Sequence, residues 1–368
     1  MMAKSRRNFL KILGGGTVVA AVGVGAFLST RTPMQALAPW ESAGNYQDIR
    51  KWALSYALLA PNPHNRQPWQ VDLSIANQVV IYRDKEKDLR HTDPFSRQLT
   101  IGMGCFLELL SIAATQQNHT VSYQLFPEGE EGPVAVATFT QGAQLEPLFA
   151  HVMQRRSCKK PFADQLVSNQ LVQKLSAFAE VVTEHKQVDS LRKLSLSAWL
   201  VEANTPRTWR ESVDLMRIGK AEINANPDGI DLGGALMESL NIAGIMTRES
   251  QLDKNSSGYK EGMNIYEKML KATPAYCTIS TAGNSRIDQI DAGRRWLRLN
   301  LQTTALGLSL HPISQVLQEY PEMSEHYNKV HSLLAKPGHT LQMFARLGYG
   351  PSVAHTPRWP LEAKIING

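Results

Sequence analysis

The chain has 368 residues, of which 43% are hydrophobic and 20% are charged, with 25 Gly and 19 Pro. This size and composition allow a sizeable core and exclude an intrinsically disordered protein, a collagen-like fibre and a polytopic membrane protein. The net charge is +6, from 39 basic and 33 acidic residues. Five basic residues precede residue 39, where no acidic residue occurs, so 34 basic residues face 33 acidic ones in the rest of the chain. No basic face is indicated, and no nucleic-acid binding is expected.

Residues 1–38 have the features of an export signal. The run S-R-R-N-F-L-K at residues 5–11 precedes a weakly hydrophobic, glycine-rich run over residues 12–28, which matches a twin-arginine signal. It predicts the twin-arginine translocase as a partner, and a location in the periplasm or anchored to the outer face of the cytoplasmic membrane. An ordinary basic start before a membrane anchor is the alternative interpretation.

The fate of this signal stays open at the level of sequence. Ala36-Leu37-Ala38 resembles a cleavage site, but Pro39 follows directly and should hinder processing. Both cleavage and retention as an N-terminal anchor are therefore compatible with the sequence. Because the twin-arginine route carries folded proteins, often with a cofactor already bound, the signal also suggests a cofactor.

Cysteine and histidine usage argues against a metal site. Cys105, Cys158 and Cys277 are too few and too scattered for a disulfide framework. No C-x-x-C motif and no His/Cys cluster occurs, so we expect no metal ligation.

The first predicted half covers residues 39–144. A helix is expected over 48–60, because Ile49, Trp52 and Leu59 fall on one face and prolines follow. A long helix over 99–115 is apolar on nearly every side, so it should be buried, and Gly102 and Gly104 would allow close backbone approach. Short strands are expected on either side of it, over residues 71–75, 79–82, 121–126 and 134–139.

The second predicted half covers residues 145–368. Helices dominate from a Ser168-capped helix to about residue 270, and residues 223–262 combine turn-formers with apolar side chains, as in a lid or an exposed insertion. A helix over 288–306 and strands over 308–313 and 340–347 follow. Because helices outnumber short strands and no βαβ repeat with a Gly-rich turn occurs, the sequence predicts an α+β fold and not a Rossmann layout.

Three clusters carry residues suited to ligand binding. The first is the loop P-N-P-H-N-R-Q-P-W at 61–69, whose amides and imidazole can donate and accept at fixed angles. The second is R-R-S-C-K at 155–159, whose guanidinium groups suit phosphate oxygens. Arg358, after the R-L-G-Y-G run at 346–350, could add another phosphate contact. Each pattern alone also suits an ordinary turn or a solvated basic run.

Together the clusters resemble the flavin-binding nitroreductase family. A-P-N-P-H-N-R-Q-P-W at 60–69 is similar to the family loop that contacts the FMN ribityl chain and ring, R-R-S-C-K is similar to the family's phosphate-binding opening, and L-G-L-S-L-H-P-I-S-Q at 306–315 is similar to the segment whose N–H groups face the flavin ring. The resemblance implies a nitroreductase-like fold, a mixed or antiparallel sheet flanked by helices, and FMN as cofactor. The cofactor-binding residues that it implies are His64, Asn65, Gln67, Arg155, Arg156, Ser157, Lys159, Ser314, Gln315 and Arg358.

The order of these motifs departs from the family pattern. The Q-P-W loop precedes the R-R-S-x-K run by some ninety residues, whereas the family's opening comes first. Two degenerate fused halves account for this, as in the Acg-type branch, since family members are typically homodimers whose sites use both subunits. We therefore expect a monomer that forms an internal pseudo-dimer with one FMN. Ser314-Gln315 in place of the family's Glu-Gly leaves the substrate-side chemistry undefined.

The implied function is an exported FMN-dependent oxidoreductase that reduces a nitroaromatic, a quinone or a related small-molecule acceptor. The alternative is a protein that stores or sequesters FMN without turnover. The electron donor could be NAD(P)H, a quinol or a protein, and no catalytic side chain is assigned. His64 is either a proton donor or a hydrogen-bonded residue packed on the ring. A Ser/His/Asp hydrolase is excluded, because no G-x-S-x-G motif occurs.

Overall fold

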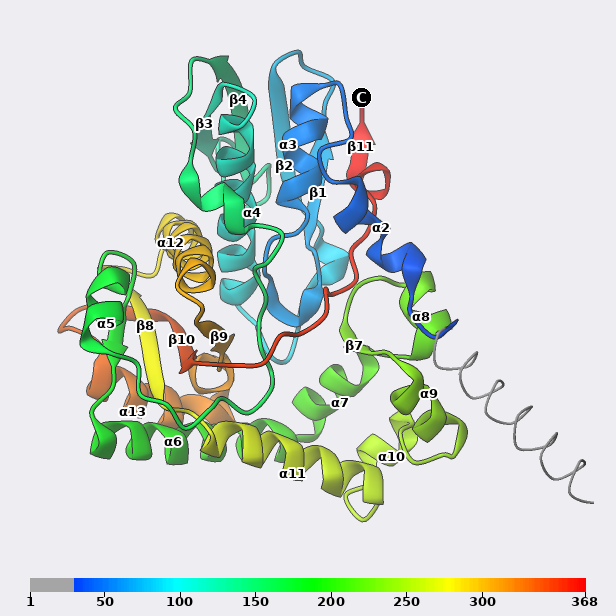
Figure 1. Cartoon of the computed structure of the whole chain (residues 1–368), viewed down its shortest axis with the longest axis vertical. Helices are drawn as coiled ribbons and strands as arrows, with labels where there is room; N and C mark the ends of the chain where they lie inside the picture. The colour runs from blue at the N-terminus through cyan, green and yellow to red at the C-terminus, as the bar shows by residue number, and fades with distance from the viewer. Residues whose placement is uncertain (1–29) are drawn as a thin grey trace, which may run out of the picture.

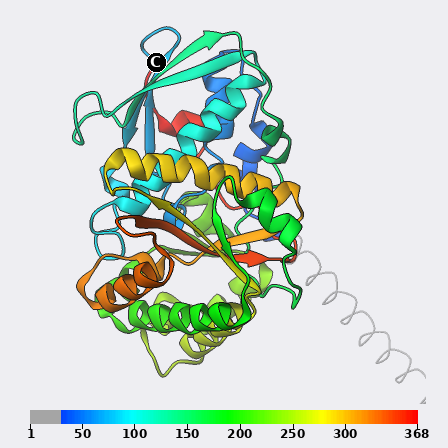
Figure 2. The same ribbon diagram turned by 90° about the vertical axis from the view of Figure 1, so that its left-hand side faces the viewer.

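The computed structural model describes residues 30–368, so that the predicted signal lies almost entirely outside the described residues. The fold is α+β, as the sequence predicts, and contains two main sheets with helices between and around them (Figure 1). Helix α12 (Arg286–Ala305) runs across the middle of the molecule, between the first sheet and the second (Figure 2). Helices α6 (His185–Asn204), α11 (Ser257–Lys271) and α13 (Ser324–Leu334) cover the far side of the second sheet.

The first sheet has five strands in the order β11-β1-β2-β4-β3. The strands are β1 (Trp69–Asp72), β2 (Gln78–Arg83), β3 (His119–Leu125), β4 (Ala135–Gln141) and β11 (Ile365–Asn367). The pairs within residues 69–141 are antiparallel, whereas β11 adds in parallel to the edge beside β1. The predicted boundary at residue 144/145 therefore does not separate the two sheets fully, because β11, at the end of the second half, belongs to the sheet of the first half.

The second sheet has four antiparallel strands in the order β5-β8-β10-β9. The strands are β5 (Glu180–Val182), β8 (Ala275–Thr281), β9 (Ser309–Pro312) and β10 (Thr340–Gly348). Strand β8 was not predicted from the sequence, although its A-Y-C-T-I-S-T run lies between Pro274 and Gly283 and most of it is buried. Its aromatic and β-branched residues between two breakers were the available signal.

The two sheets have the same topology. The order β1-β2-β4-β3 matches β5-β8-β10-β9, all these pairs are antiparallel, and a long helix joins the second strand to the third in each case. In the first half this helix is α4 (Arg97–Thr115), and in the second it is α12. The halves differ in the link between their first two strands, which covers residues 73–77 in the first and residues 183–274 in the second.

Helices α4 and α12 cross at a glycine of each. A Cβ on Gly104 would lie 2.2 Å from the Ile290 carbonyl oxygen, and a Cβ on Gly293 would lie 2.0 Å from the Ile101 oxygen. Gly104 and Gly293 are each the eighth residue of their helix, and Ile101 and Ile290 are each the fifth. The contact is thus reciprocal, as in a two-fold symmetric interface. The close approach expected at Gly104 is confirmed.

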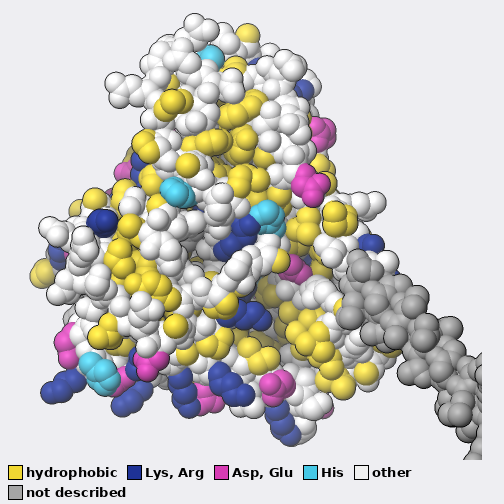
Figure 3. Space-filling view, in the orientation of Figure 1, with side chains coloured by type: hydrophobic (Ala, Val, Ile, Leu, Met, Phe, Trp, Pro, Cys, Tyr) yellow, Lys and Arg dark blue, Asp and Glu magenta, His cyan; other side chains and the backbone are white. Residues whose placement is uncertain are grey.

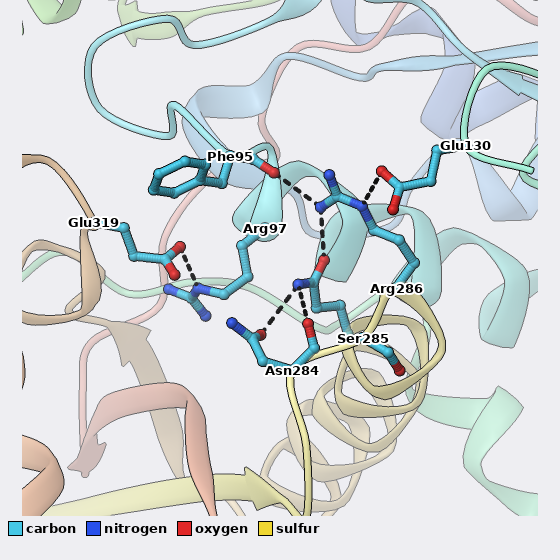
Figure 4. A pocket seen from close by; sticks show the side chains of 8 residues that line it. Phe95, Arg97, Glu130, Asn284, Ser285, Arg286 and Glu319 are labelled. Atoms are coloured by element: carbon cyan, nitrogen blue, oxygen red, sulfur yellow. Dashed lines mark hydrogen bonds and ion pairs between the residues drawn. The ribbon is translucent and has the colours of Figure 1, made fainter.

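The first residues of the two helices form a matching pair of ion pairs. Arg97 of α4 binds Glu319 from the β9–β10 connection at 3.0 Å, and Arg286 of α12 binds Glu130 from the β3–β4 connection at 2.9 Å. Figure 4 shows the four side chains around a polar cavity of about 360 Å³. Each helix start is therefore tied to the connection supplied by the other half, again in a reciprocal way.

The link between β5 and β8 is folded and attached to the first half. Besides α6 and α11 it contains α7 (Pro206–Asp214), β6 (Met216–Ile218), α8 (Gly219–Ala225), β7 (Ile230–Leu232), α9 (Ala235–Ile242) and α10 (Arg248–Leu252). Asp228, before β7, is buried and binds Lys87 at 2.7 Å and Arg217 at 2.9 Å. Residues 226–229, part of the 223–262 segment that the sequence predicts to be a lid or an exposed insertion, are therefore attached to the first half.

The other boundaries expected from sequence hold with small shifts. The predicted helix at 48–60 is α3 (Ile49–Ala57), and Ser168 caps α5 (Asn169–Leu175) as expected. The predicted strand at 71–75 begins two residues earlier, at Trp69. The boundary at 38/39 cuts through α2 (Met34–Ser42), in which Ala36 and Trp40 are buried, so these residues belong to the folded protein.

One described helix, α4, is long and apolar enough to cross a membrane, and it is largely buried as a core helix. The three cysteines are free and buried. Within residues 30–368, no group of three or more His, Cys, Asp or Glu side chains could hold a metal ion.

Candidate cofactor site

The R-R-S-C-K run lies against the segment at 306–315 that the sequence analysis also selected. Ser157 forms a parallel bridge with Leu310 of β9, and the Cys158 N–H donates to the Leu310 carbonyl at 2.9 Å. This pairing extends the second sheet by one bridge and directs Lys159 toward the end of β9. The second cluster and the 306–315 segment are thus adjacent in space, although about 150 residues separate them in the sequence.

Arg358 reaches the C-terminal end of α3. Its guanidinium group donates to the carbonyl oxygens of Leu58 at 2.9 Å and of Leu59 and Ala60 at 3.2 Å, and to Asn65 Oδ1 at 2.6 Å. The side chain is 2% exposed. A cation at the end of a helix satisfies carbonyl groups that lack helical partners. Because each of its nitrogen atoms already donates to the protein, Arg358 first holds the backbone in place, and its expected direct phosphate contact is not evident.

Arg155 meets Arg358 at the same carbonyl. It is buried and donates to Leu59 O at 3.0 Å and to Asn300 Oδ1 of α12 at 3.3 Å. Burial, with a further contribution from Arg156, lowers the pKa of Arg155 to about 10. Burial and the two neighbouring arginines lower the pKa of Arg358 to about 9. The two cations are thus held close together at an energetic cost.

Arg156 and His355 both contact the ring of Trp40 in α2. The His355 ring stacks on Trp40 with centroids 4.0 Å apart, and the Arg156 guanidinium carbon lies 4.9 Å from the Trp40 ring centroid. Burial and then the charges of Arg156, Arg358 and Arg155 lower the pKa of His355 to about 4, which keeps it neutral near pH 7. Burial lowers the pKa of Arg156 to about 10. Cation–π contact offsets part of the cost of these charges.

No carboxylate of the described chain balances this cluster of cations. The shifts of Arg155, Arg156, Arg358 and His355 arise from burial and from one another, apart from a small contribution of Cys105 to Arg155. Two donors there are also buried without an acceptor, Arg156 Nε and Asn300 Nδ2. Buried cations are normally paired, and buried donors are normally satisfied. The donor set therefore fits an anionic group rich in oxygen, such as a phosphate.

The amide side chains of the 61–69 loop bind the protein itself. Asn65 Nδ2 donates to Pro357 O at 3.0 Å, besides the contact of its oxygen with Arg358. Gln67, fully buried, donates to Pro227 O at 2.6 Å and accepts from the Trp359 N–H at 2.9 Å. Both side chains lock the loop between the C-terminal arm and residues 226–229. Gln67 therefore has a structural role in this loop, whereas Asn65 Nδ2 keeps a second hydrogen that could be donated to a cofactor.

His64 and Trp69 of this loop each have a buried polar atom without a partner, and that of His64 is the Nδ1 atom of its ring. The φ of His64 is 47°. Positive φ at His64, Asn65 and Gln67 is costly for non-glycine residues and is typical of functional sites. Burial, and then the charges of Lys159 and Arg66, lower the pKa of His64 to about 4. The ring is therefore neutral near pH 7 and suits hydrogen bonding better than proton donation.

Lys159 lies near enough to His64, His311 and Asp231 for its charge to act on them. Its side chain is exposed to solvent, yet the surrounding protein desolvates it enough to lower its pKa, while Asp231 of β7 acts in the opposite direction. Lys159 contributes to lowering the pKa values of both His64 and His311. Figure 3 shows basic side chains and a histidine gathered near the middle of this face.

Ser314 and Gln315 begin the short 3-10 helix η4 (Gln315–Leu317), directly after β9. Ser314 makes no capping hydrogen bond with its side chain. Because Ser157 pairs with Leu310, these residues follow the strand that lies beside Lys159. The structure thus brings the 155–159 and 309–315 segments together, and it joins Arg358 to the 61–69 loop.

Several residues of the site were not selected from the sequence as ligands. These are Trp40, Asn300, His355 and Asp231. Asn300 is a polar residue on the buried face of a predicted helix, which was an available signal. Trp40 and Asp231 carried none, because only packing brings α2 and β7 to the cluster.

Comparison with known proteins gives one class of relative. No family model matches the chain. The chain is 23% identical over 332 residues to a Mycobacterium tuberculosis protein named "Putative NAD(P)H nitroreductase acg", and the match covers 86% of this chain and 94% of that protein.

Solved structures with similarity to this chain align with only part of it. A nitroreductase with bound FMN from Desulfitobacterium hafniense aligns with a TM-score of 0.36 and 12% identity, over 60% of this chain and 98% of its own. The FMN-dependent nitroreductase NfnB from Mycobacterium smegmatis, in complex with NADPH, aligns with a TM-score of 0.37 and 15% identity, over 59% of this chain and 96% of its own.

Proposed function

We propose that the chain is an FMN-dependent oxidoreductase of nitroreductase type, exported by the twin-arginine pathway, that holds one FMN within a monomer. The observation that carries the proposal is the cluster of Arg155, Arg156 and Arg358, which has buried donors to spare and no carboxylate to balance it. A relative named as an NAD(P)H nitroreductase, similar over 86% of the chain, supports the reaction class.

Two fused halves underlie this proposal. The repeated strand order, the reciprocal glycine contact and the reciprocal ion pairs are what a homodimer leaves behind when its subunits become one chain. The cation cluster combines carbonyl groups from residues 58–60 with arginines from the second half. One chain can therefore complete the site without a partner.

FMN, when bound, supplies hydride and electron transfer through its ring system. Arg156 and Asn300 have the free donors for its phosphate, and Arg155 and Arg358 supply positive charge and hold the 58–60 carbonyls. Lys159 provides a further positive charge, which acts on His64. The backbone N–H groups at Ser314 and Gln315 remain our predicted contacts for the ring, and Ser157 a predicted contact beside Arg156.

Arg156→Gln is the variant that tests the phosphate assignment. Arg156 is half-buried, donates to Met153 O and Arg155 O and lies over the Trp40 ring, so its loss removes few contacts and should leave the fold intact. We expect FMN to bind about 10- to 100-fold more weakly, the scale of a charge-assisted hydrogen bond, while riboflavin, which lacks the phosphate, binds as before. Titration followed by flavin fluorescence measures both, with the exposed Arg210→Gln as control. Equal losses for both ligands, or none for FMN, would contradict the assignment.

Turnover separates an enzyme from an FMN store. The attachment of residues 226–229, through Asp228 and the Gln67–Pro227 contact, argues against a lid that opens at these residues during turnover and so favours the storage function as the second candidate. Purified yellow protein that bleaches anaerobically with NADH or NADPH, and reoxidises with a nitroaromatic or quinone, is an enzyme. Protein that bleaches only with dithionite indicates storage. Protein that bleaches only with a quinol indicates that a quinol is the electron donor.

A further inference from the structure

Helix α9 is apolar and yet leaves its apolar side chains uncovered. Its sequence is A-L-M-E-S-L-N-I, and none of its eight residues is buried. Leu236 is 68% exposed and Ile242 is 74% exposed, and Ile245 in the following turn is 39% exposed. A helix of this composition normally buries a face, and a contiguous exposed apolar patch marks an interaction surface.

The start of the described chain is tied to the same helix. Arg31 Nη1 binds Glu238 of α9 at 2.9 Å, and Lys220 Nζ donates to the Thr30 carbonyl at 2.9 Å. Met34, a few residues further on, is 55% exposed. Hydrophobic side chains gather beside the point where the described chain begins (Figure 3). The exposed apolar side chains Leu236, Ile242, Ile245 and Met34, here called the α9 patch, thus belong to segments that adjoin residue 30.

The sequence places an apolar run immediately before this point. Residues 12–28 form the run, of a length close to the minimum for spanning a bilayer. One residue, Ser29, separates it from Thr30 in the sequence, and an extended chain covers only about 3.5 Å per residue. If the run crosses a membrane, α9 must lie within several ångströms of the lipid surface.

Removal of the run at its apparent cleavage site is opposed by the fold. Ala36 is buried in α2, its N–H donates to Asn224 Oδ1 at 3.1 Å, and its carbonyl accepts from the Arg358 N–H at 2.8 Å. A peptidase needs an accessible, extended backbone, which residues 36–38 do not offer in a protein that is already folded when it is exported. These contacts of Ala36 are the basis for expecting the signal to stay attached to the folded protein.

We propose that the α9 patch lies on the phospholipid surface, with residues 12–28 as the adjacent anchor. Apolar side chains of a surface helix enter about 5–10 Å into the headgroup region. The two contacts cooperate, since the anchor brings the patch to the membrane and the patch fixes the orientation of the protein. The proposal rests on the export signal within the proposed function, and it requires neither FMN nor turnover.

A fluorophore at residue 242 tests the orientation. The native cysteines are buried, so Ile242→Cys in the full chain can be labelled selectively with a nitrobenzoxadiazole dye. Leu166→Cys is the matched control, because Leu166 is 76% exposed and belongs to another part of the surface. In phosphatidylcholine/phosphatidylglycerol vesicles we expect a blue-shifted emission and at least three-fold stronger quenching by nitroxide-labelled lipid at residue 242 than at residue 166.

Two other results would overturn the proposal. Equal emission and quenching at residues 242 and 166 would show that the patch does not meet lipid. A blue shift at residue 242 that rises with protein concentration in detergent, without vesicles, would assign the patch to a second copy of the chain.

The N-terminus is tested separately in an export-competent host. Mass spectrometry of the protein from the membrane fraction should give a chain that retains residues 12–28. A chain that begins at Pro39 would contradict retention, whereas FMN content and turnover could still be as proposed.

Discussion

The two sheets share one topology, but what surrounds them differs. The first half closes the link between its first two strands with residues 73–77, whereas the second half fills it with residues 183–274. The first half supplies the 58–60 carbonyls and the 61–69 loop, and the second supplies Arg155, Asn300 and Arg358. The two sheets are thus built alike, whereas the candidate site draws different residues from each half.

The largest effect is expected where the two halves touch. Gly104→Val and Gly293→Val should each lower the free energy of unfolding by about 3 kcal/mol or more, because the new side chain would meet a backbone carbonyl that cannot move freely. Similar losses from both variants would reflect the reciprocal contact. Urea unfolding measures them.

Gly262→Ala in α11 is the control for glycine itself. An added Cβ there meets nothing closer than Gln251 Oε1 at 3.5 Å. Alanine should therefore be neutral or stabilise the helix by up to about 1 kcal/mol. A tolerated valine at residue 104 or 293 would remove the argument for a close helix crossing.

The matching arginines at the helix starts should differ in their effect. Arg97 is 1% exposed and also binds the carbonyls of Leu317 and Gln342, so Arg97→Met should cost about 2–3 kcal/mol. The partner of Arg286, Glu130, has a side chain that is 62% exposed, so Arg286→Met should cost at most about 1 kcal/mol. Chemical denaturation of the two variants compares them, and equal costs would show that burial does not distinguish the halves.

Asp228 should make the attachment of the second-half link depend on pH. Burial raises the pKa of this carboxyl, but the ion pairs with Lys87 and Arg217 more than offset it, and the net shift is downward from 3.8. Its contribution is therefore complete above about pH 4 and is lost as the pH falls through the lowered value. Asp228→Asn should cost about 2 kcal/mol at pH 7.

The pH series itself provides the check. The difference in unfolding free energy between wild type and Asp228→Asn should stay constant from pH 5 to pH 7 and shrink below pH 4. A difference that grows on acidification would mean that the carboxyl is not held in its charged form by these cations.

The smallest effect is expected for β11, the strand that the second half adds to the sheet of the first half. Removal of residues 365–368 deletes β11 and its parallel pairing with β1, including the bond from Leu73 N to Asn367 O at 2.8 Å. We expect a loss of about 1 kcal/mol and faster amide exchange in β1 than in β5. Unchanged exchange in β1 would show that the first sheet is complete without the C-terminus.

Local signals in the sequence were sufficient for most elements and for the residue types of the site. The apolar periodicity of α4, the Ser168 cap and the turn between β3 and β4 depend on neighbours within a few residues, so they can be identified without the fold. The clusters at 61–69 and 155–159 were identified for the same reason. Strand β8 was missed because its short buried run has no alternation.

Tertiary structure alone decided which of these groups have partners. The spacing of residues does not reveal that Arg155 and Arg358 donate to the same Leu59 carbonyl. Nor does it reveal that Asn65 and Gln67 make hydrogen bonds within the protein, whereas Asn300 Nδ2 and Arg156 Nε have no partner. Those outcomes depend on contacts between segments up to 300 residues apart. Whether a polar group can bind a ligand is set by what else lies within about 3 Å of it, and only the packed chain determines that.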